Sequence, residues 1–279
     1  MLRKKGRHPG VLKERVLTAL VLVVVLLGVM LGMPPMATVV LLTLLVLIGA
    51  WEWAGFIGKG GLPTRVGFTA AVGLGMFGCL ELYWASAAYV SVVMWVAVAW
   101  WFVAFLWVCL APARVNALNA ALAGLLSLVP CWLALVYVTI STQNTHWVLF
   151  TLALVWAADT GAFFAGRWLG RVPLAPRVSP KKTWEGVIGG VLLSGFVAWV
   201  AAHWLLPVNH PWPFVMVCVA VAALSIVGDL TESMLKRAAG LKDSGSLFPG
   251  HGGMLDRIDS VTAAAPALVF ALLGLEVIP

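Results

Sequence analysis

Charged residues are scarce in this sequence. Only 10% of the 279 residues are Asp, Glu, Lys or Arg, and 62% are hydrophobic, whereas soluble domains average about 25% charged residues. The few charges are also unbalanced, with 11 acidic residues against 18 Lys and Arg. This composition excludes an ordinary soluble domain and is typical of a polytopic membrane protein.

Cysteines are equally few, and they are scattered through apolar segments. Cys79, Cys109, Cys131 and Cys218 lack the short spacings of a metal site, so the sequence predicts neither a zinc centre nor a disulfide framework. Internal repeats, low-complexity tracts and a soluble domain are also missing. We therefore expect one membrane domain over residues 1–279.

Apolar segments of about 20 residues are long enough to cross the hydrocarbon core of a bilayer. Nine segments meet this condition, at residues 15–33, 36–57, 64–81, 86–110, 117–140, 146–166, 184–206, 212–232 and 258–276. The sequence thus predicts an all-α polytopic membrane protein of about nine transmembrane helices.

The basic residues predict the orientation of these helices, because short cytoplasmic loops collect Lys and Arg. With the N-terminus in the cytoplasm and the C-terminus in the periplasm, all 18 basic residues fall on the cytoplasmic side. We expect a multi-pass protein of the bacterial inner membrane whose cytoplasmic face attracts anionic lipid and nucleotide. Nucleic acid is not an expected partner, because no basic domain protrudes from the bilayer.

Carboxylates are concentrated between residues 225 and 260, which hold five of the eleven. Asp229 follows a long apolar run, where an unpaired acid is expensive and usually functional. Asp256 and Asp259 are three residues apart and share one face of a helical first turn. Such carboxylates can hold a hard divalent cation. Alternatively, Asp229 pairs with Lys236 or Arg237, and the other two acids favour a helix N-terminus.

The segment between these acids, KRAAGLKDSGSLFPGHGG, combines cations with glycines. Cations can face an anionic ligand while glycines let backbone N–H groups approach its oxygens. The segment therefore favours a metal-bound polyphosphate. A cytoplasmic loop that only signals orientation would explain the basic residues, but not the PGHGG motif or the acids.

Two further candidates precede this stretch. Asp159 lies in apolar sequence and is expected to face a polar cavity or a neighbouring helix. The SPKKT segment places Ser179, Lys181 and Lys182 at the start of a helix, where free N–H groups can bind phosphate; an orientation signal would also explain these lysines. Glu52, between two tryptophans, is interpreted as an interfacial acid.

These residues resemble the signature of the phosphatidate cytidylyltransferases, also called CDP-diacylglycerol synthases. Asp159 and SPKKTWEG precede the signature in the same order, so the resemblance covers roughly the C-terminal half. The matching positions lie between residues 233 and 259 and are Ser233, Leu235, Lys236, Arg237, Lys242, Asp243, Pro249, His251, Gly252, Gly253, Asp256, Arg257 and Asp259.

The resemblance implies transfer of a cytidylyl group from CTP to phosphatidate, which yields CDP-diacylglycerol and pyrophosphate. Residues 146–279 then form the catalytic half and residues 1–145 a helical scaffold. We expect Mg²⁺, with a second cation allowed, on Asp229, Asp256 and Asp259, which act in catalysis together with Lys242 and Arg257. The expected substrate-binding residues are Ser179, Lys181, Lys182, Lys236, Arg237, Asp243, His251, Gly252, Gly253 and Asp159.

Several alternatives stay open at this point. A related CTP-dependent lipid cytidylyltransferase or a lipid kinase would use the same chemistry. An ion-coupled secondary transporter would place acids near helix centres and show an internal repeat, and this sequence shows neither. The roles of Asp243 and His251, as loop organisers or cytidine contacts, are not decided by the sequence, nor is a homodimer.

Overall fold

The computed structural model describes residue 21 and residues 23–58, 60–247 and 252–279. Eight helices within this part are long and apolar enough to cross a membrane. The α-helices are α2 (Pro35–Trp53), α3 (Leu62–Ala85), α4 (Ala88–Leu110), α5 (Ala117–Thr142), α6 (His146–Trp168), α7 (Trp184–Val200), α8 (Pro211–Ala238) and α9 (Leu255–Gly274). A 3-10 turn, η1 (Ala54–Phe56), extends α2, and a π turn, η2 (Ala201–Leu205), extends α7.

These helices confirm the membrane character of the chain and eight of the predicted spans. Residues 15–20 and 22 of the first predicted span, residues 15–33, lie outside the described residues, and its described part contains a short apolar helix, Val23–Gly32. The largest difference is at α8, which continues to Ala238 instead of ending near residue 232. Lys236 and Arg237 therefore lie on the last turn of a helix, where cations are favoured by the helix dipole, and not in a loop.

Helix ends follow local sequence signals. Asn116 and Asn119 form a reciprocal capping box at the start of α5, and proline occupies the first turn of α2, α3 and α8. At the end of α8, Gly240 has a φ of 71°, which residues with a side chain rarely adopt. The chain leaves α8 in this left-handed turn and immediately enters the segment rich in charge.

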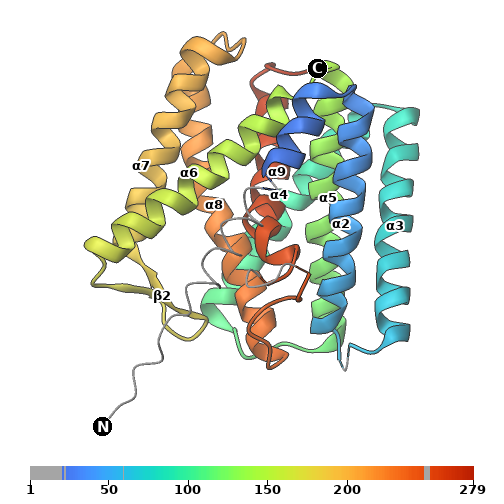
Figure 1. Cartoon of the computed structure of the whole chain (residues 1–279), viewed down its shortest axis with the longest axis vertical. Coiled ribbons are helices and arrows are strands. Elements are labelled where there is room, and N and C mark those ends of the chain that lie inside the picture. The colour runs from blue at the N-terminus through green and yellow to red at the C-terminus, as the bar shows by residue number, and fades with distance from the viewer. Residues whose placement is uncertain (1–20, 22, 59, 248–251) are drawn as a thin grey trace.

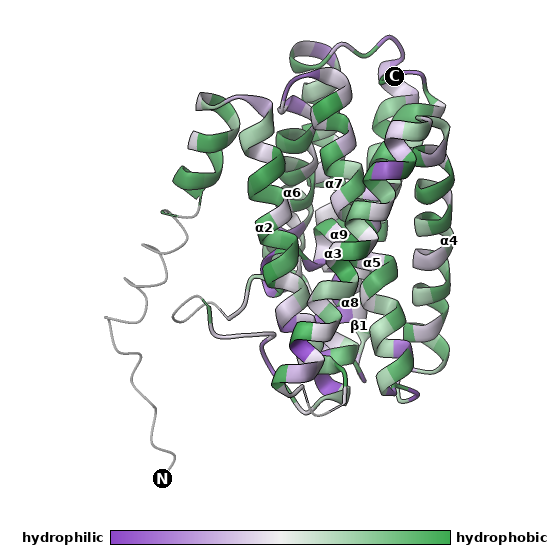
Figure 2. Ribbon diagram, turned by 90° about the vertical axis from the view of Figure 1, so that its right-hand side faces the viewer, coloured by the Kyte–Doolittle hydropathy of each residue, from purple (hydrophilic) through white to green (hydrophobic). Residues whose placement is uncertain are grey.

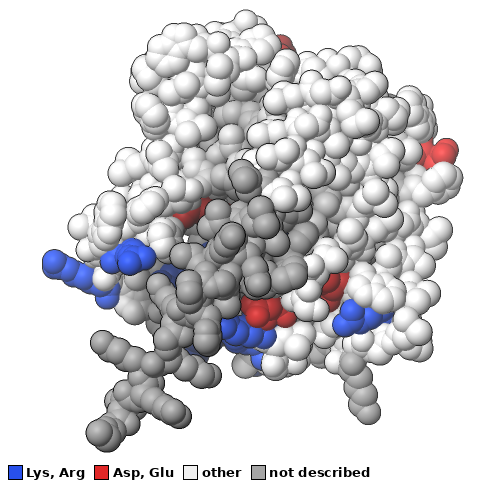
Figure 3. Space-filling model, viewed as in Figure 1, with Lys and Arg blue, Asp and Glu red and all other residues white. Residues whose placement is uncertain are grey.

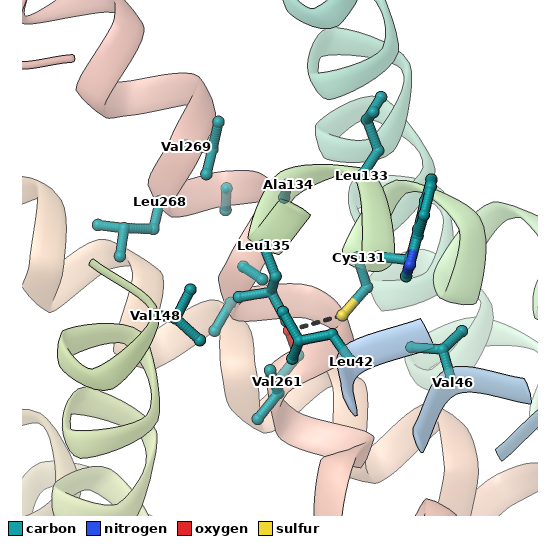
Figure 4. Close-up of a cluster of buried hydrophobic side chains, with 14 of the residues drawn as sticks. Leu42, Val46, Cys131, Leu133, Ala134, Leu135, Val148, Val261, Leu268 and Val269 are labelled. Atoms are coloured by element: carbon teal, nitrogen blue, oxygen red, sulfur yellow. Dashed lines mark hydrogen bonds between the residues drawn. The ribbon is translucent and has the colours of Figure 1, made fainter. Parts of the chain in front are cut away.

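The helices form a bundle in which α5 is the most thoroughly buried. It packs against α2, α3, α4 and α9. Figure 1 shows α7 and the hairpin on the opposite side of α8 from α2 and α3, with α6 running obliquely across the view. Figure 4 shows the core between α2, α5 and α9, where the Cys131 thiol donates to the Val261 carbonyl at 3.7 Å. Hydrophobic residues extend along the helices (Figure 2), and all four cysteines are free.

One small sheet interrupts the otherwise helical fold. Strands β1 (Pro173–Ala175) and β2 (Ser179–Thr183) form an antiparallel hairpin between α6 and α7. The hydroxyl of Thr183 accepts from the Gly186 N–H at 3.2 Å and so caps α7. Glu185 instead accepts from the Val172 N–H. The SPKKT segment therefore reaches α7 as an edge strand.

Glycines allow α6 and α7 to pack almost backbone to backbone. A Cβ atom added at Gly161 would lie 2.3 Å from the Gly189 carbonyl oxygen, and one at Gly190 would lie 2.6 Å from the Ala158 oxygen. Small residues at such crossings are how membrane helices approach closely. Gly161 and Gly190 therefore permit the close crossing of α6 and α7.

Gly161→Ala should destabilise the fold, because the new methyl group has no space between α6 and α7. Overpacking of this kind costs about 1–3 kcal/mol, so the melting temperature in detergent should fall. Gly67→Ala on α3 is the matched control, since an added Cβ there meets nothing within 4 Å. Equal melting temperatures for the two variants would contradict this packing.

Candidate functional site

The charged side chains gather at one end of the bundle. This end holds the α2–α3, α4–α5, α6–α7 and α8–α9 connections, whereas the C-terminus lies at the other end (Figure 1). In the same view the Lys and Arg side chains lie in the lower part of the molecule (Figure 3). The described basic residues at this end are Arg65, Arg114, Arg167, Arg171, Arg177, Lys181, Lys182, Lys236, Arg237, Lys242 and Arg257.

Lys236 lies at the centre of this region. Its ammonium group contacts Glu232 Oε2 at 2.7 Å, one turn earlier on α8, and Asp256 Oδ1 at 2.7 Å on α9. Lys236 is only 8% exposed and Glu232 only 1% exposed. The sequence predicted that Lys236 binds substrate phosphate, but in this structure it joins two helices through carboxylates.

Asp256 is held on both of its oxygens. Oδ1 faces Lys236, while Oδ2 accepts from the Gly253 N–H at 2.8 Å and from the Ser244 N–H at 3.0 Å. The Ser244 hydroxyl oxygen also lies 3.0 Å from Oδ2. Gly252 has a φ of 83°, and a Cβ there would lie 2.6 Å from Asp256 Oδ2. Glycine at this position therefore lets the chain turn closely around the carboxylate.

Asp229 forms a second ion pair nearby. Its Oδ2 lies 2.5 Å from the Lys182 Nζ on β2, and its Oδ1 accepts from the Ser233 hydroxyl at 3.2 Å. Asp159 on α6 is close enough to interact electrostatically with both Asp229 and Lys182. The ion pair therefore joins the hairpin to α8, with Asp159 of α6 within electrostatic reach of it.

Asp259 connects the two ion pairs. It lies one turn after Asp256 on α9, and its charge interacts with those of Asp229, Glu232 and Lys236. A Cβ at Gly228 would lie 2.6 Å from the Asp259 carbonyl oxygen, so α8 and α9 touch here. The sequence predicted that Asp256 and Asp259 share one face of a helix, and the place of both residues beside Lys236 is consistent with that prediction.

Glu52 was missed as a site residue, and its interpretation as an interfacial acid is wrong. Its side chain is 6% exposed and accepts hydrogen bonds from Ser244, Met254 and Leu255. Its neighbour Trp53 is buried as well and donates to the Ala120 carbonyl. The only signal in the sequence was a carboxylate within an apolar segment, which does not identify partners about 200 residues away.

The other predicted site residues surround this cluster. Arg237, Lys242, Asp243, Arg257 and Lys181 are exposed, Ser179 is partly exposed, and Gly253 is buried beside Glu52 and Ser244. The exposed Lys181 and Lys242 place positive charge beside this cluster, where an anionic ligand can reach it. His251 and Pro249 lie outside the described residues.

The acids in the cluster fit a divalent cation in charge and donor type. Five carboxylates (Asp159, Asp229, Glu232, Asp256 and Asp259) surround two ammonium groups (Lys182 and Lys236). Oxygen ligands are those that Mg²⁺ prefers, and the excess negative charge favours a further cation. Among the described residues, however, no three acidic, His or Cys side chains are already arranged as a metal centre, and both Asp256 oxygens are engaged.

An apolar groove lies beside the Asp229 ion pair. Its volume is about 600 Å³, and it is bounded by α4, the hairpin, α7 and α8. Val227 and Leu230 on α8, which flank Asp229 in sequence, line it together with Val108 and Val178, and Arg177 is its charged residue. Because Arg177 belongs to the charged end, the groove extends to that end of the bundle.

The fold and the site define a multi-pass membrane protein with buried acids and exposed cations at one end of its bundle. A model of the Cytidylyltransferase family matches residues 13–274, and the chain belongs to this family.

Two curated relatives are similar over nearly their whole lengths. A phosphatidate cytidylyltransferase from Haemophilus influenzae is 37% identical over 91% of this chain and 96% of its own length. Another from Pseudomonas aeruginosa is 39% identical over 94% of this chain and 96% of its own. The predicted family is confirmed, and the similarity extends beyond the C-terminal half in which the motifs lie.

Lys236→Met should destabilise the protein strongly, because it leaves Glu232 and Asp256 buried without their cation. Removing one partner of a buried pair typically costs about 3–5 kcal/mol. Arg237→Met, on the same turn but exposed, is the matched control. Thermal unfolding in detergent should show a large loss for the first variant and a small one for the second. Similar unfolding would leave Lys236 as a ligand-binding cation only.

Proposed function

We propose that this protein is a membrane enzyme that transfers a cytidylyl group from CTP to phosphatidate and releases pyrophosphate. The observation that carries this proposal is the similarity to phosphatidate cytidylyltransferases over more than nine tenths of both chains. The charged cluster beside an apolar groove supports it, because one substrate is a nucleotide and the other is a lipid.

The chemistry follows from the charges of the substrates. An oxygen of the phosphatidate phosphate attacks the α-phosphorus of CTP, and the bond to the β-phosphate breaks. A phosphate monoester has a second pKa near 6, so the attacking group is already ionised at neutral pH and needs no strong base. The main requirements are to bring two anions together and to stabilise the leaving pyrophosphate.

We assign these requirements to the charged cluster. Asp229 and Asp259 would hold Mg²⁺, which when bound supplies positive charge to the nucleotide phosphates. Asp256, the third metal ligand predicted from sequence, would bind the metal only by giving up a present contact, since it already receives Lys236 and two backbone N–H donors. Lys181, Lys242 and Arg257 would neutralise phosphate oxygens.

The groove suits the lipid substrate. Its volume of about 600 Å³ lies within the range of about 300–1,000 Å³ typical of ligand sites. An acyl chain between Val108, Val178 and Leu230 would leave the phosphate near Lys182 and Arg177. Phosphatidate could then react without leaving the membrane.

The arrangement of charge supports a site that faces the cytoplasm of a bacterial inner membrane. CTP is a cytoplasmic polyanion that cannot cross hydrocarbon, and the basic residues all lie at the charged end of the described bundle. By the charge rule for loops, this end is cytoplasmic and the C-terminal end periplasmic. A ninth helix at residues 15–33 would place the N-terminus in the cytoplasm.

Asp229→Asn should abolish the formation of CDP-diacylglycerol from labelled CTP and phosphatidate. The change keeps the side-chain volume but removes the charge that faces Lys182 and the proposed metal. Purified wild-type and variant protein should be assayed over a Mg²⁺ series, with Glu81→Gln on the exposed face of α3 as control. Normal turnover by Asp229→Asn at saturating Mg²⁺ would refute this assignment, and an inactive wild type would refute the proposed reaction.

Single cysteines should report the orientation of the bundle. In a background without the four native cysteines, Ser246→Cys lies in the exposed α8–α9 connection and Ser86→Cys in the exposed α3–α4 connection, at opposite ends. An impermeant maleimide should label only the second variant in intact spheroplasts, and CTP with Mg²⁺ should shield the first in opened membranes. Labelling of Ser246→Cys from outside would reverse the proposed topology.

A further inference from the structure

We propose that Glu52 is a positioning residue for the nucleotide site, although it belongs to α2 in the N-terminal half. Its carboxylate holds the start of α9 and the described part of the α8–α9 loop, residues 239–247 and 252–254, against the end of α2. Three donors from this region meet it: the Leu255 N–H at 2.8 Å, the Ser244 hydroxyl at 3.0 Å and the Met254 N–H at 3.1 Å.

Ser244 contacts both Glu52 and Asp256, and so links Glu52 to the charged cluster. Its hydroxyl lies 3.0 Å from Glu52 Oε2 and 3.0 Å from Asp256 Oδ2, and its backbone N–H donates to the same Asp256 oxygen. Asp256 in turn binds Lys236 on α8. Glu52 is therefore two contacts away from the ion pair that joins α8 to α9.

The loop has glycines where the Glu52 carboxylate needs space. A Cβ at Gly245 would lie 2.4 Å from Oε1, and a Cβ at Gly253 would lie 2.2 Å from Oε2. Either methyl group would displace the carboxylate. The loop is thus shaped around Glu52 from both sides, which a surface acid would not require.

A carboxylate is suited to position 52 because the groups around it are hydrogen-bond donors. Within the described residues no Lys, Arg or His lies within ion-pair distance of Glu52, so hydrogen bonds alone compensate its burial. Carboxylates accept on both oxygens, whereas glutamine would present an amide N–H to a backbone N–H. A buried group that loses its partner is expensive, so the amide should displace the loop or α9.

We place the exposed Lys242 and Asp243 of this loop in contact with CTP, so the position of the loop determines how CTP binds. In this respect the inference rests on the proposed function. Lys242 and Asp243 immediately precede Ser244, the residue that Glu52 binds. Glu52 touches neither substrate in this arrangement. Its effect should therefore appear in the use of CTP and not in the use of lipid.

The test compares Glu52→Gln, Gly245→Ala and the exposed control Glu81→Gln. For each, kcat, KM for CTP and KM for phosphatidate are measured in detergent, together with the melting temperature. Glu52→Gln should reduce kcat/KM for CTP by about tenfold to a hundredfold through a higher KM for CTP, while KM for phosphatidate stays near the wild-type value. Gly245→Ala should give the same pattern from the loop side, and Glu81→Gln should resemble wild type.

The outcomes separate positioning from simple stability. A lower melting temperature and less active enzyme, with both KM values unchanged in Glu52→Gln and Gly245→Ala, would overturn the inference. If Glu52→Gln does not fold, a normal KM for CTP in Gly245→Ala would overturn it as well. An active wild type with unaffected variants refutes the role of Glu52 alone, whereas an inactive wild type refutes the proposed reaction.

Discussion

The pairing of Lys236 with Glu232 and Asp256 is the interaction on which the site depends. A buried carboxylate within an apolar bundle is costly, and Glu232 is only 1% exposed. Lys236 meets Glu232 and Asp256 at 2.7 Å each, and Lys182 meets Asp229 at 2.5 Å. Because each lysine connects different elements, neutralising the acids also fixes α8 against α9 and the hairpin against α8.

Close backbone approach makes these pairings possible. Gly228 brings α8 onto the Asp259 carbonyl, and Gly161 with Gly189 brings α7 onto α6, which holds Asp159. The carboxylates of three helices thereby come near one another without long side chains to span the distance. These close contacts leave no space between the crossing helix backbones at Gly161, Gly189 and Gly228.

Much of the fold could be predicted from the sequence, because a bilayer imposes length and hydrophobicity on each helix. The acids of α8 and α9 were also recognisable, since charge in an apolar chain is unusual. The partners of these acids could not be recognised from the sequence. Glu232 and Lys236 are one turn apart and could be paired from spacing, but the contact of Lys236 with Asp256 requires the loop to fold back. Glu52 depends on a contact with Leu255, 203 residues away.

The contrast between buried and exposed cations explains how one end of the bundle can be rigid and still bind an anionic ligand. Lys236 is enclosed and already shared by two acids, so its charge is committed to the fold. Lys181 and Lys242 are exposed and keep their charge for a polyanion. In the proposed reaction a nucleotide from water would meet the exposed cations first, while a lipid would lie along the groove lined by Leu230 and Arg177. The two substrates would then meet where the helices end.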